Sequence, residues 1–227
     1  MIPLKDDNPT SSRPIVTYFL IGLCVVVFLM QLGSQSYRTG QLFYSYGLIP
    51  SVLMGHDQLP MDLYVVPAYM TIFSSMFMHG GWMHLIGNMW YMKIFADNIE
   101  DNLGSRNFII FYILCGIGAA MTQVLMNTHS QVPMVGASGA IGGVLGAYLI
   151  NHPNARVLVL IPYIIITIIK IRALYVLGFW FILQFISSGG GIAYAAHIGG
   201  FVSGMILILF FNKKTKRKTK VIKGPWS

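Results

Sequence analysis

Long apolar segments recur along this chain. The first occupies about residues 14–32 and the last about residues 193–211. A helix needs roughly 20 mostly apolar residues to cross a hydrocarbon core about 30 Å thick. With 55% hydrophobic and 10% charged residues and a mean hydropathy of +0.65, the sequence is typical of membrane proteins rather than soluble domains. We therefore expect an all-α polytopic membrane protein.

Six segments are expected to cross the membrane as helices. They are residues 14–32, 82–99, 107–126, 138–150, 174–187 and 193–211. At about 1.5 Å per residue, the fourth is too short to cross the hydrocarbon core alone, so it needs other helices around it and a polar cavity or loop above its start. The first is expected to be retained, because its length suits a span and no clear Ala-x-Ala cleavage site follows it.

The first connection, residues 33–78, is long and largely apolar. Pro50, Pro60 and Pro67 interrupt it, and five tyrosines lie within it. A structureless loop of this length would be unusual. Because tyrosine is enriched where a membrane meets water, we expect short helices that lie in the membrane interface.

Residues 157–169 form a second apolar connection. Arg156 and Lys170 bracket it and Pro162 interrupts it, and its second half is rich in β-branched residues. As a helix it would reach only about 20 Å, which is short of a crossing. We predict a buried or interfacial connection and not a seventh span.

Positive charge is distributed unevenly along the chain. Seven of the fifteen Lys and Arg residues lie between residues 213 and 223. With six spans and the basic end inside, fourteen of the fifteen face the cytoplasm and only Arg38 lies outside. This predicts a multi-pass cell-membrane protein with a cytoplasmic N-terminus of residues 1–13, a membrane domain of residues 14–211 and a basic cytoplasmic tail of residues 212–227. The tail is expected to contact anionic lipid, and nucleic acid is not an expected partner.

Several chemistries find no support in the sequence. Cys24 and Cys115 both lie in apolar segments, so no disulfide framework is expected. A His-Glu-x-x-His zinc motif is absent, and His79 and His84 lack carboxylate or Cys partners nearby. The spans hold no Asp pair and the chain holds no Walker loop. We therefore expect neither a metal nor a cofactor.

Four polar residues share one depth in the predicted bundle. Spans two, four and six run in the same direction, from outside to inside. Their first turns contain His84 and Asn88, Ser138, and His197, respectively. Polar and ionisable residues inside a membrane usually face the bundle interior or a wet cavity. The three spans are therefore predicted to bring these side chains together near the outer face.

Small residues predict which helices pack closely. Two stripes at helical spacing each begin at a polar residue: Ser138, Gly142 and Gly146 in span four, and His197, Gly200 and Gly204 in span six. Such stripes let two backbones approach closely, so facing stripes would place a nucleophile beside a base. The Gly-flanked helix start could also supply backbone N–H groups to a developing negative charge, and His84 and Asn88 could point donors into the same cavity.

Each of these residues also has a simpler interpretation. A Ser in a membrane helix commonly bonds its own backbone, a His is usually a satisfied core residue, and Asn88 could join two helices. Small residues in apolar helices usually mean packing alone. These interpretations do not explain why His84, Asn88, Ser138 and His197 are all predicted at the same depth.

Three motifs resemble a known family. His79-x-x-x-x-His84-x-x-x-Asn88, Gly136-Ala137-Ser138-Gly139 and Ala196-His197-Ile198-Gly199-Gly200 are similar to the signatures of rhomboid intramembrane serine proteases of the bacterial, six-span type. Their order and the long first loop match as well, over essentially residues 14–211. The resemblance implies a rhomboid-like bundle that hydrolyses a peptide bond in or next to the transmembrane segment of another membrane protein.

The resemblance also implies roles for the matched residues. Ser138 would be the nucleophile and His197 the general base, as a dyad without an Asp. His84, Asn88 and the Ser138 N–H would stabilise the oxyanion, and His79 would lie near the site. Gly142 stands where some members carry a Tyr that packs on the catalytic His, so Tyr194 or an aromatic residue of span five would take over that contact.

Two functions from other classes stay open. A rhomboid-like protein without activity would bind helices of membrane proteins without cutting them. A transporter has less support, because no acidic or cationic relay lines the spans.

Overall fold

The computed structural model describes residues 1–34, 36–162, 166–186 and 193–211. The predicted basic tail, residues 212–227, lies outside the described residues. Its contact with anionic lipid and the proposed domain limits therefore stay predictions.

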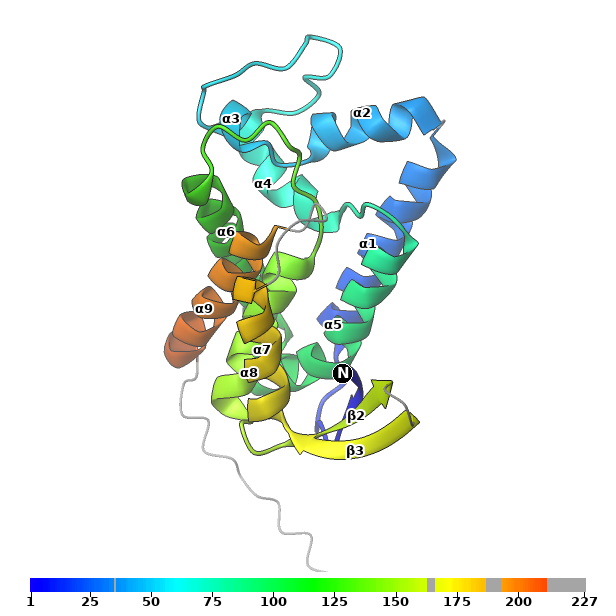
Figure 1. Ribbon diagram of the computed structural model, residues 1–227, viewed down its shortest axis with the longest axis vertical. Coiled ribbons are helices and arrows are strands. Elements are labelled where there is room, and N and C mark those ends of the chain that lie inside the picture. Colours follow the sequence, from blue (N-terminus) through cyan, green and yellow to red (C-terminus); the bar gives the residue numbers. More distant parts are fainter. Residues whose placement is uncertain (35, 163–165, 187–192, 212–227) are drawn as a thin grey trace, which may run out of the picture.

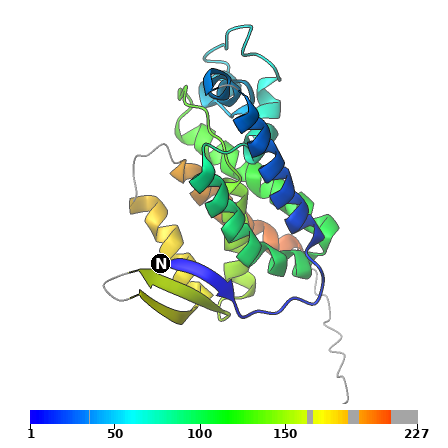
Figure 2. The ribbon, with the colours of Figure 1, turned by 90° about the vertical axis from the view of Figure 1, so that its right-hand side faces the viewer.

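The described chain is a bundle of long helices (Figures 1 and 2). Each of the six expected spans is helical: α1 (Ile15–Gly33), α5 (Trp82–Leu103), α6 (Ser105–Met126), α7 (Ser138–Asn151), α8 (Ala173–Ile186) and α9 (Tyr194–Phe211). Of these, α1, α6 and α9 are long and apolar enough to cross a membrane, while α7 and α8 are shorter apolar helices. The predicted polytopic helical bundle is confirmed, and it classes the chain as a multi-pass membrane protein.

Helix α7 forms the centre of the bundle. Every residue from Gly139 to Tyr148 is buried, and α7 contacts α5, α6, α8 and α9. The short helix is therefore enclosed by protein, which is what its length requires.

Backbone contacts join α7 to α9. A Cβ added at Gly200 would lie 1.9 Å from the Gly139 oxygen, and one at Gly204 would lie 1.9 Å from the Gly143 oxygen. Only glycine permits this approach. Gly142 and Gly146 of the predicted stripe also face α9, where added Cβ atoms would lie 3.0 Å from the His197 oxygen and 2.1 Å from the Phe201 oxygen. The small-residue faces of the two helices therefore meet along the contact.

Short helices form much of the first connection, as expected. They are α2 (Ser36–Tyr46), α3 (Pro50–Leu53), η1 (Ala68–Met70), α4 (Thr71–Ser74) and η2 (Ser75–Phe77). They lie at the end of the bundle where α5, α7 and α9 begin (Figure 1). Backbone hydrogen bonds between Leu48 and Met134 join this connection to the segment before α7. Its place in a membrane interface stays a prediction.

A small antiparallel sheet at the opposite end was not predicted. Its strands are β1 (Ile2–Asp6), β2 (Arg156–Pro162) and β3 (Ile166–Arg172), in the order β1-β2-β3. The described residues of 157–169 are thus a connection and not a span, as expected, but they form parts of two paired strands. Their β-branched residues suit strands, and Val157 and Val159 pack into the core.

The buried carboxylate of Glu100 and the half-buried carboxylate of Asp6 hold the N-terminal segment against α5 and α7. The Glu100 carboxylate accepts hydrogen bonds from the backbone N–H groups of Val16 and Thr17, at 2.9 and 2.8 Å, and so caps α1. Asp6 accepts hydrogen bonds from the Tyr148 hydroxyl at 2.6 Å and from the Asn98 amide at 3.0 Å.

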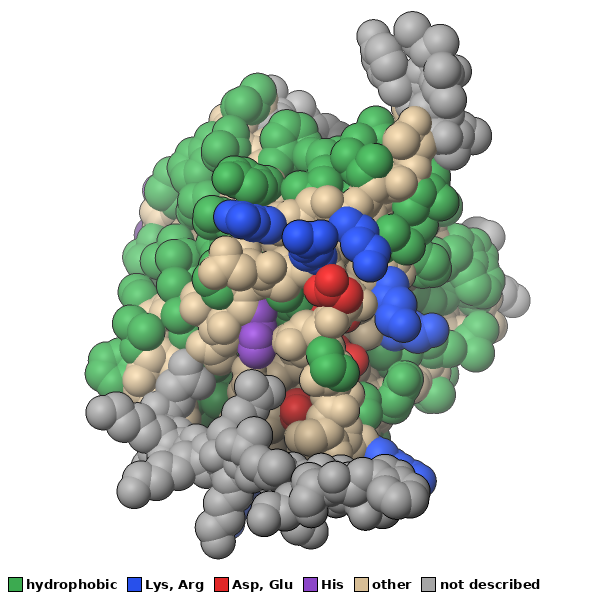
Figure 3. All heavy atoms as spheres, turned by 90° about the horizontal axis from the view of Figure 1, so that it is seen from below, with side chains coloured by type: hydrophobic (Ala, Val, Ile, Leu, Met, Phe, Trp, Pro, Cys, Tyr) green, Lys and Arg blue, Asp and Glu red, His purple; other side chains and the backbone are tan. Residues whose placement is uncertain are grey.

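The face at this sheet end is rich in basic side chains. Figure 3 shows Lys and Arg side chains gathered on it, next to a smaller group of acidic ones. Arg156, Lys170 and Arg172 of the sheet are exposed, as are Lys5 and Arg13 of the N-terminal segment.

Candidate active site

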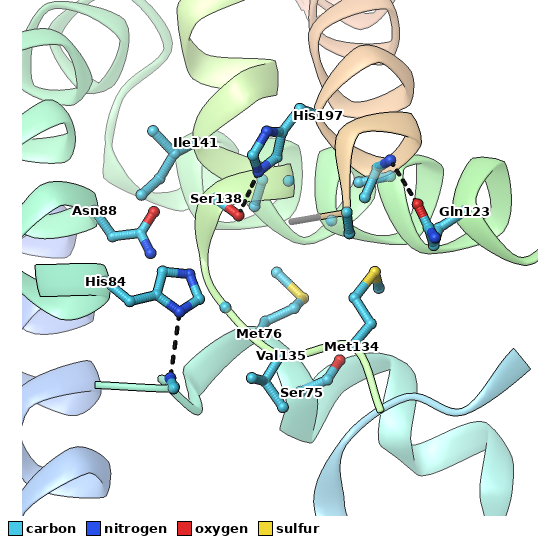
Figure 4. Close-up of a pocket in the computed structure, with 18 of the residues that line it drawn as sticks. Ser75, Met76, His84, Asn88, Gln123, Met134, Val135, Ser138, Ile141 and His197 are labelled. Atoms are coloured by element: carbon cyan, nitrogen blue, oxygen red, sulfur yellow. Dashed lines mark hydrogen bonds between the residues drawn. The ribbon is translucent and has the colours of Figure 1, made fainter. Parts of the chain in front are cut away.

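A cavity opens into the bundle at the end opposite the sheet. Its volume is about 1040 Å³, and α5, α6, α7, α8, α9 and the segment before α7 all line it. Four of the predicted site residues face it: Ser138, His197, His84 and Asn88. Figure 4 shows them converging from three helices. Apart from the two His residues, none of its described lining residues has a basic or an acidic side chain.

Ser138 and His197 are in direct contact. The Ser138 Oγ lies 2.8 Å from the His197 Nε2 (Figure 4). Ser138 is the first residue of α7 and His197 lies in the first turn of α9. The close contact between Gly139, next to Ser138, and Gly200, one turn after His197, lets the starts of the two helices approach each other. In this geometry the hydroxyl can donate its proton to an unprotonated Nε2.

The other ring nitrogen of His197 has a partner that sequence analysis missed. Its Nδ1 lies 2.8 Å from the Oε1 of Gln184 in α8. The Gln184 Nε2 donates to the Trp180 oxygen, also at 2.8 Å. The available signal was a single amide in an otherwise apolar span, since polar groups at membrane depth usually face a partner.

Aromatic residues lie against the His197 ring. The Trp180 ring centroid lies 5.8 Å away with an interplanar angle of 34°, and Tyr194 meets the ring edge-on at 6.3 Å. A Cβ at Gly142 would lie 3.7 Å from the Trp180 ring and 3.0 Å from the His197 oxygen. Both Trp180, an aromatic residue of span five, and Tyr194 thus lie against the His197 ring, as expected where Gly142 replaces a Tyr.

His84 has a defined tautomer. Its Nδ1 accepts a hydrogen bond from the Gly80 N–H at 3.2 Å, so a neutral ring carries its proton on Nε2. That nitrogen approaches Gly136, where a Cβ would lie only 2.7 Å from it. Gly136 also has φ +129°, so glycine is required there both by the backbone and by the neighbouring ring.

Asn88 has an unused donor. Its side chain is 7% exposed, and within the described part of the chain its Nδ2 has no hydrogen-bond partner. A buried amide donor left unpaired costs free energy, about 1–3 kcal/mol. Because Asn88 lines the cavity beside Ser138, a bound substrate oxygen is a natural acceptor for it.

His79 lies behind His84 and does not line the cavity. It is 1% exposed, and its ring meets the His84 ring edge-on at a centroid distance of 5.2 Å. Its Nδ1 lies 3.2 Å from the Phe77 oxygen, and its backbone bonds the amide of Gln31 in α1. His79 therefore lies near the site, in contact with His84 and outside the cavity lining.

No metal cluster is found in the described ranges. Over these residues, no group of three or more His, Cys, Asp or Glu side chains could hold an ion. Cys24 and Cys115 are both free and buried.

Comparison with known proteins identifies a family. The family model of the Rhomboid domain matches residues 66–214. "Rhomboid protease GluP" of Bacillus subtilis is 28% identical over 197 residues, which cover 86% of this chain and 34% of that protein. Two Arabidopsis thaliana proteins are also similar. "RHOMBOID-like protein 5" is 32% identical over 34% of this chain and 25% of its own length. "RHOMBOID-like protein 6, mitochondrial" is 30% identical over 60% of this chain and 41% of its own length.

The chain thus spans between a quarter and about two fifths of the length of these three relatives. The match to the family model covers well over half of this chain and includes all three motifs, His79 to Asn88, Gly136 to Gly139 and Ala196 to Gly200. The chain belongs to the rhomboid family.

Proposed function

We propose that this chain is an intramembrane serine endopeptidase that cleaves a peptide bond in or next to the transmembrane segment of another membrane protein. The observation that carries the proposal is the contact of 2.8 Å between the Ser138 Oγ and the His197 Nε2 inside a membrane bundle. The protease names of relatives such as GluP agree with it.

The geometry supports nucleophilic catalysis by Ser138. As its Oγ bonds to the substrate carbonyl carbon, His197 Nε2 takes the hydroxyl proton and later gives it to the leaving amine. Water then attacks the acyl-enzyme with the same ring as base. A base within hydrogen-bond reach of the nucleophile is the first requirement of this chemistry, ahead of any tuning of its pKa.

We expect three donors to stabilise the oxyanion. They are His84 Nε2–H, the unpartnered Asn88 amide and the Ser138 N–H at the start of α7. The first N–H groups of a helix have no partner within that helix, and they favour negative charge. Fixed donors in a low-dielectric site stabilise a developing charge more than they would in water.

The charge distribution supports an orientation in the cell membrane. The sheet end carries exposed Arg156, Lys170 and Arg172, and both this end and the basic tail would face the cytoplasm. The cavity would then open near the outer face, where water can reach Ser138.

Cleavage of a reconstituted transmembrane substrate tests the proposal. Ser138→Ala is expected to abolish cleavage and labelling by a fluorophosphonate, and His197→Ala should lose most activity. His84→Ala and Asn88→Ala should each lower kcat by about 10²–10³ if each supplies one oxyanion donor. Ser11→Ala, at the far end of the bundle, is the control. A Ser138→Ala protein that cleaves like the wild type would contradict the proposal, and wild-type protein that neither labels nor cleaves would favour a binder of membrane-protein helices.

A further inference from the structure

We propose that Gln184 is a positioning residue that holds His197 in the tautomer and orientation needed to accept the Ser138 proton. This inference rests on the proposed function. Ser138 of α7, His197 of α9 and Gln184 of α8 then form one chain of hydrogen bonds, in which Gln184 orients the ring.

The contacts of the Gln184 amide determine its direction. Its Nε2 donates to the Trp180 backbone oxygen at 2.8 Å, one turn earlier in α8. A flipped amide would place two oxygens against each other at Trp180, so the Oε1 must face His197. That oxygen can only accept, and it lies 2.8 Å from the His197 Nδ1. The Nδ1 therefore carries the proton.

The tautomer has a direct consequence for Ser138. A neutral imidazole with its proton on Nδ1 has a free lone pair on Nε2. That lone pair faces the Ser138 hydroxyl at 2.8 Å, as a general base must. With the opposite tautomer, the ring would point an N–H at the nucleophile and could not take its proton.

The surroundings explain why a neutral amide fills this place. Gln184 is 9% exposed in a helix that is otherwise apolar or aromatic, and no acidic side chain lines the described cavity. An ionised carboxylate at this depth would cost free energy of desolvation, whereas an amide oxygen orients the ring at lower cost. Trp180 adds a ring packed at 5.8 Å, so α8 restricts the imidazole through two neighbours.

A purely structural role is the competing explanation, because an amide in a membrane helix also joins helices. The two roles differ in what a substitution changes. Loss of a helix contact lowers the melting temperature, whereas loss of orientation lowers kcat and the reactivity of Ser138 while KM stays the same.

The test uses the full chain in liposomes with four variants. Gln184→Leu removes the acceptor at similar size, and Gln184→Asn keeps an amide but withdraws it by one methylene. Gln184→Glu, protonated at this depth, can donate its hydroxyl to the Trp180 oxygen and offer its other oxygen to His197 at the original reach. Phe185→Leu, at the next and exposed position of α8, is the matched control. For each, kcat, KM, the rate constant of fluorophosphonate labelling and the melting temperature are measured.

A positioning role for Gln184 predicts a distinct pattern of kcat, KM and labelling rate among the variants. Gln184→Leu should lower kcat and the labelling rate constant by about 10–100-fold with KM within about twofold, the scale on which small misplacements act. In Gln184→Asn, kcat and the labelling rate constant should also fall. In Gln184→Glu they should recover most of that loss, and in Phe185→Leu they should equal the wild-type values. If Gln184→Leu does not fold, the contrast between Gln184→Asn and Gln184→Glu decides.

Two results would overturn the inference while leaving the proposed protease activity intact. In the first, Gln184→Leu labels and cleaves at the wild-type rate, or Gln184→Asn does so if Gln184→Leu does not fold. In the second, the losses of activity follow the losses in melting temperature, and Gln184→Glu recovers none of the activity. Wild-type protein that neither labels nor cleaves would instead overturn the proposed function.

Discussion

Gly200 offers a direct test of the link between packing and chemistry. The Cβ of Gly200→Ala would start 1.9 Å from the Gly139 oxygen, whereas ordinary contacts begin near 3.4 Å. The two helices must therefore move apart by about 1.5 Å at a point one turn below His197. Even half of that displacement would stretch the contact of 2.8 Å between Ser138 and His197 beyond hydrogen-bond reach.

Two measured quantities should change together. Overpacking of this kind costs about 1–3 kcal/mol in the free energy of unfolding. A misplacement of about 1 Å at reacting groups costs about 10²-fold in rate, so kcat for a transmembrane substrate should fall by that order. Thermal unfolding in detergent and cleavage in liposomes measure the two effects.

The control is Gly22→Ala in α1, where the added Cβ would meet nothing within 4 Å. It should keep full activity, and its helix should gain up to about 1 kcal/mol. A Gly200→Ala protein that cleaves and melts like the wild type would refute the argument that this glycine contact sets the distance between Ser138 and His197.

The remaining predictions concern the sheet end. Glu100→Gln should lower the melting temperature, because a neutral amide has one acceptor oxygen where the carboxylate uses two for Val16 and Thr17, and a lost buried partner costs about 1–3 kcal/mol. Burial raises the pKa of Asp6 above 3.8, and the hydrogen bond from Tyr148 partly offsets this rise. The contribution of Asp6 to stability is therefore fully present below pH 3.8, and it is lost as the pH rises through the raised pKa. Melting temperatures of the wild type and Asp6→Asn across this range should therefore differ in slope, the variant being flatter; parallel curves would contradict the reasoning.

The bundle could be predicted because its signals are local. Apolar length identified the spans, and the separate spacing of Ser138, Gly142 and Gly146 identified the face of α7 that meets α9. A residue that heads such a stripe has a defined depth and direction before any partner is known. The catalytic roles drawn from this placement stay predictions until the variants are measured.

Other features depend on long-range geometry that no local pattern reports. Gln184 meets His197 because of the rotation and tilt of α8, and the apolar sequence around Gln184 sets neither. The sheet was missed for a similar reason. β1 has a partner more than 150 residues away, and β2 pairs with both β1 and β3 across the sheet.

The pairing of β1 also determines the order in which the protein is completed. Ile2 pairs with Leu160, so the first strand made must wait until α1, α5, α6 and α7 have been synthesised. Closing a loop of this length costs on the order of 4 kcal/mol of chain entropy, which favours pairing only after the bundle has drawn the two segments together. Until the two strands pair, β1 is open to other strands, and so is the edge of β2 that faces it once β2 has been made. β1 is therefore made before its partner β2, and it is among the later elements to reach its native contacts.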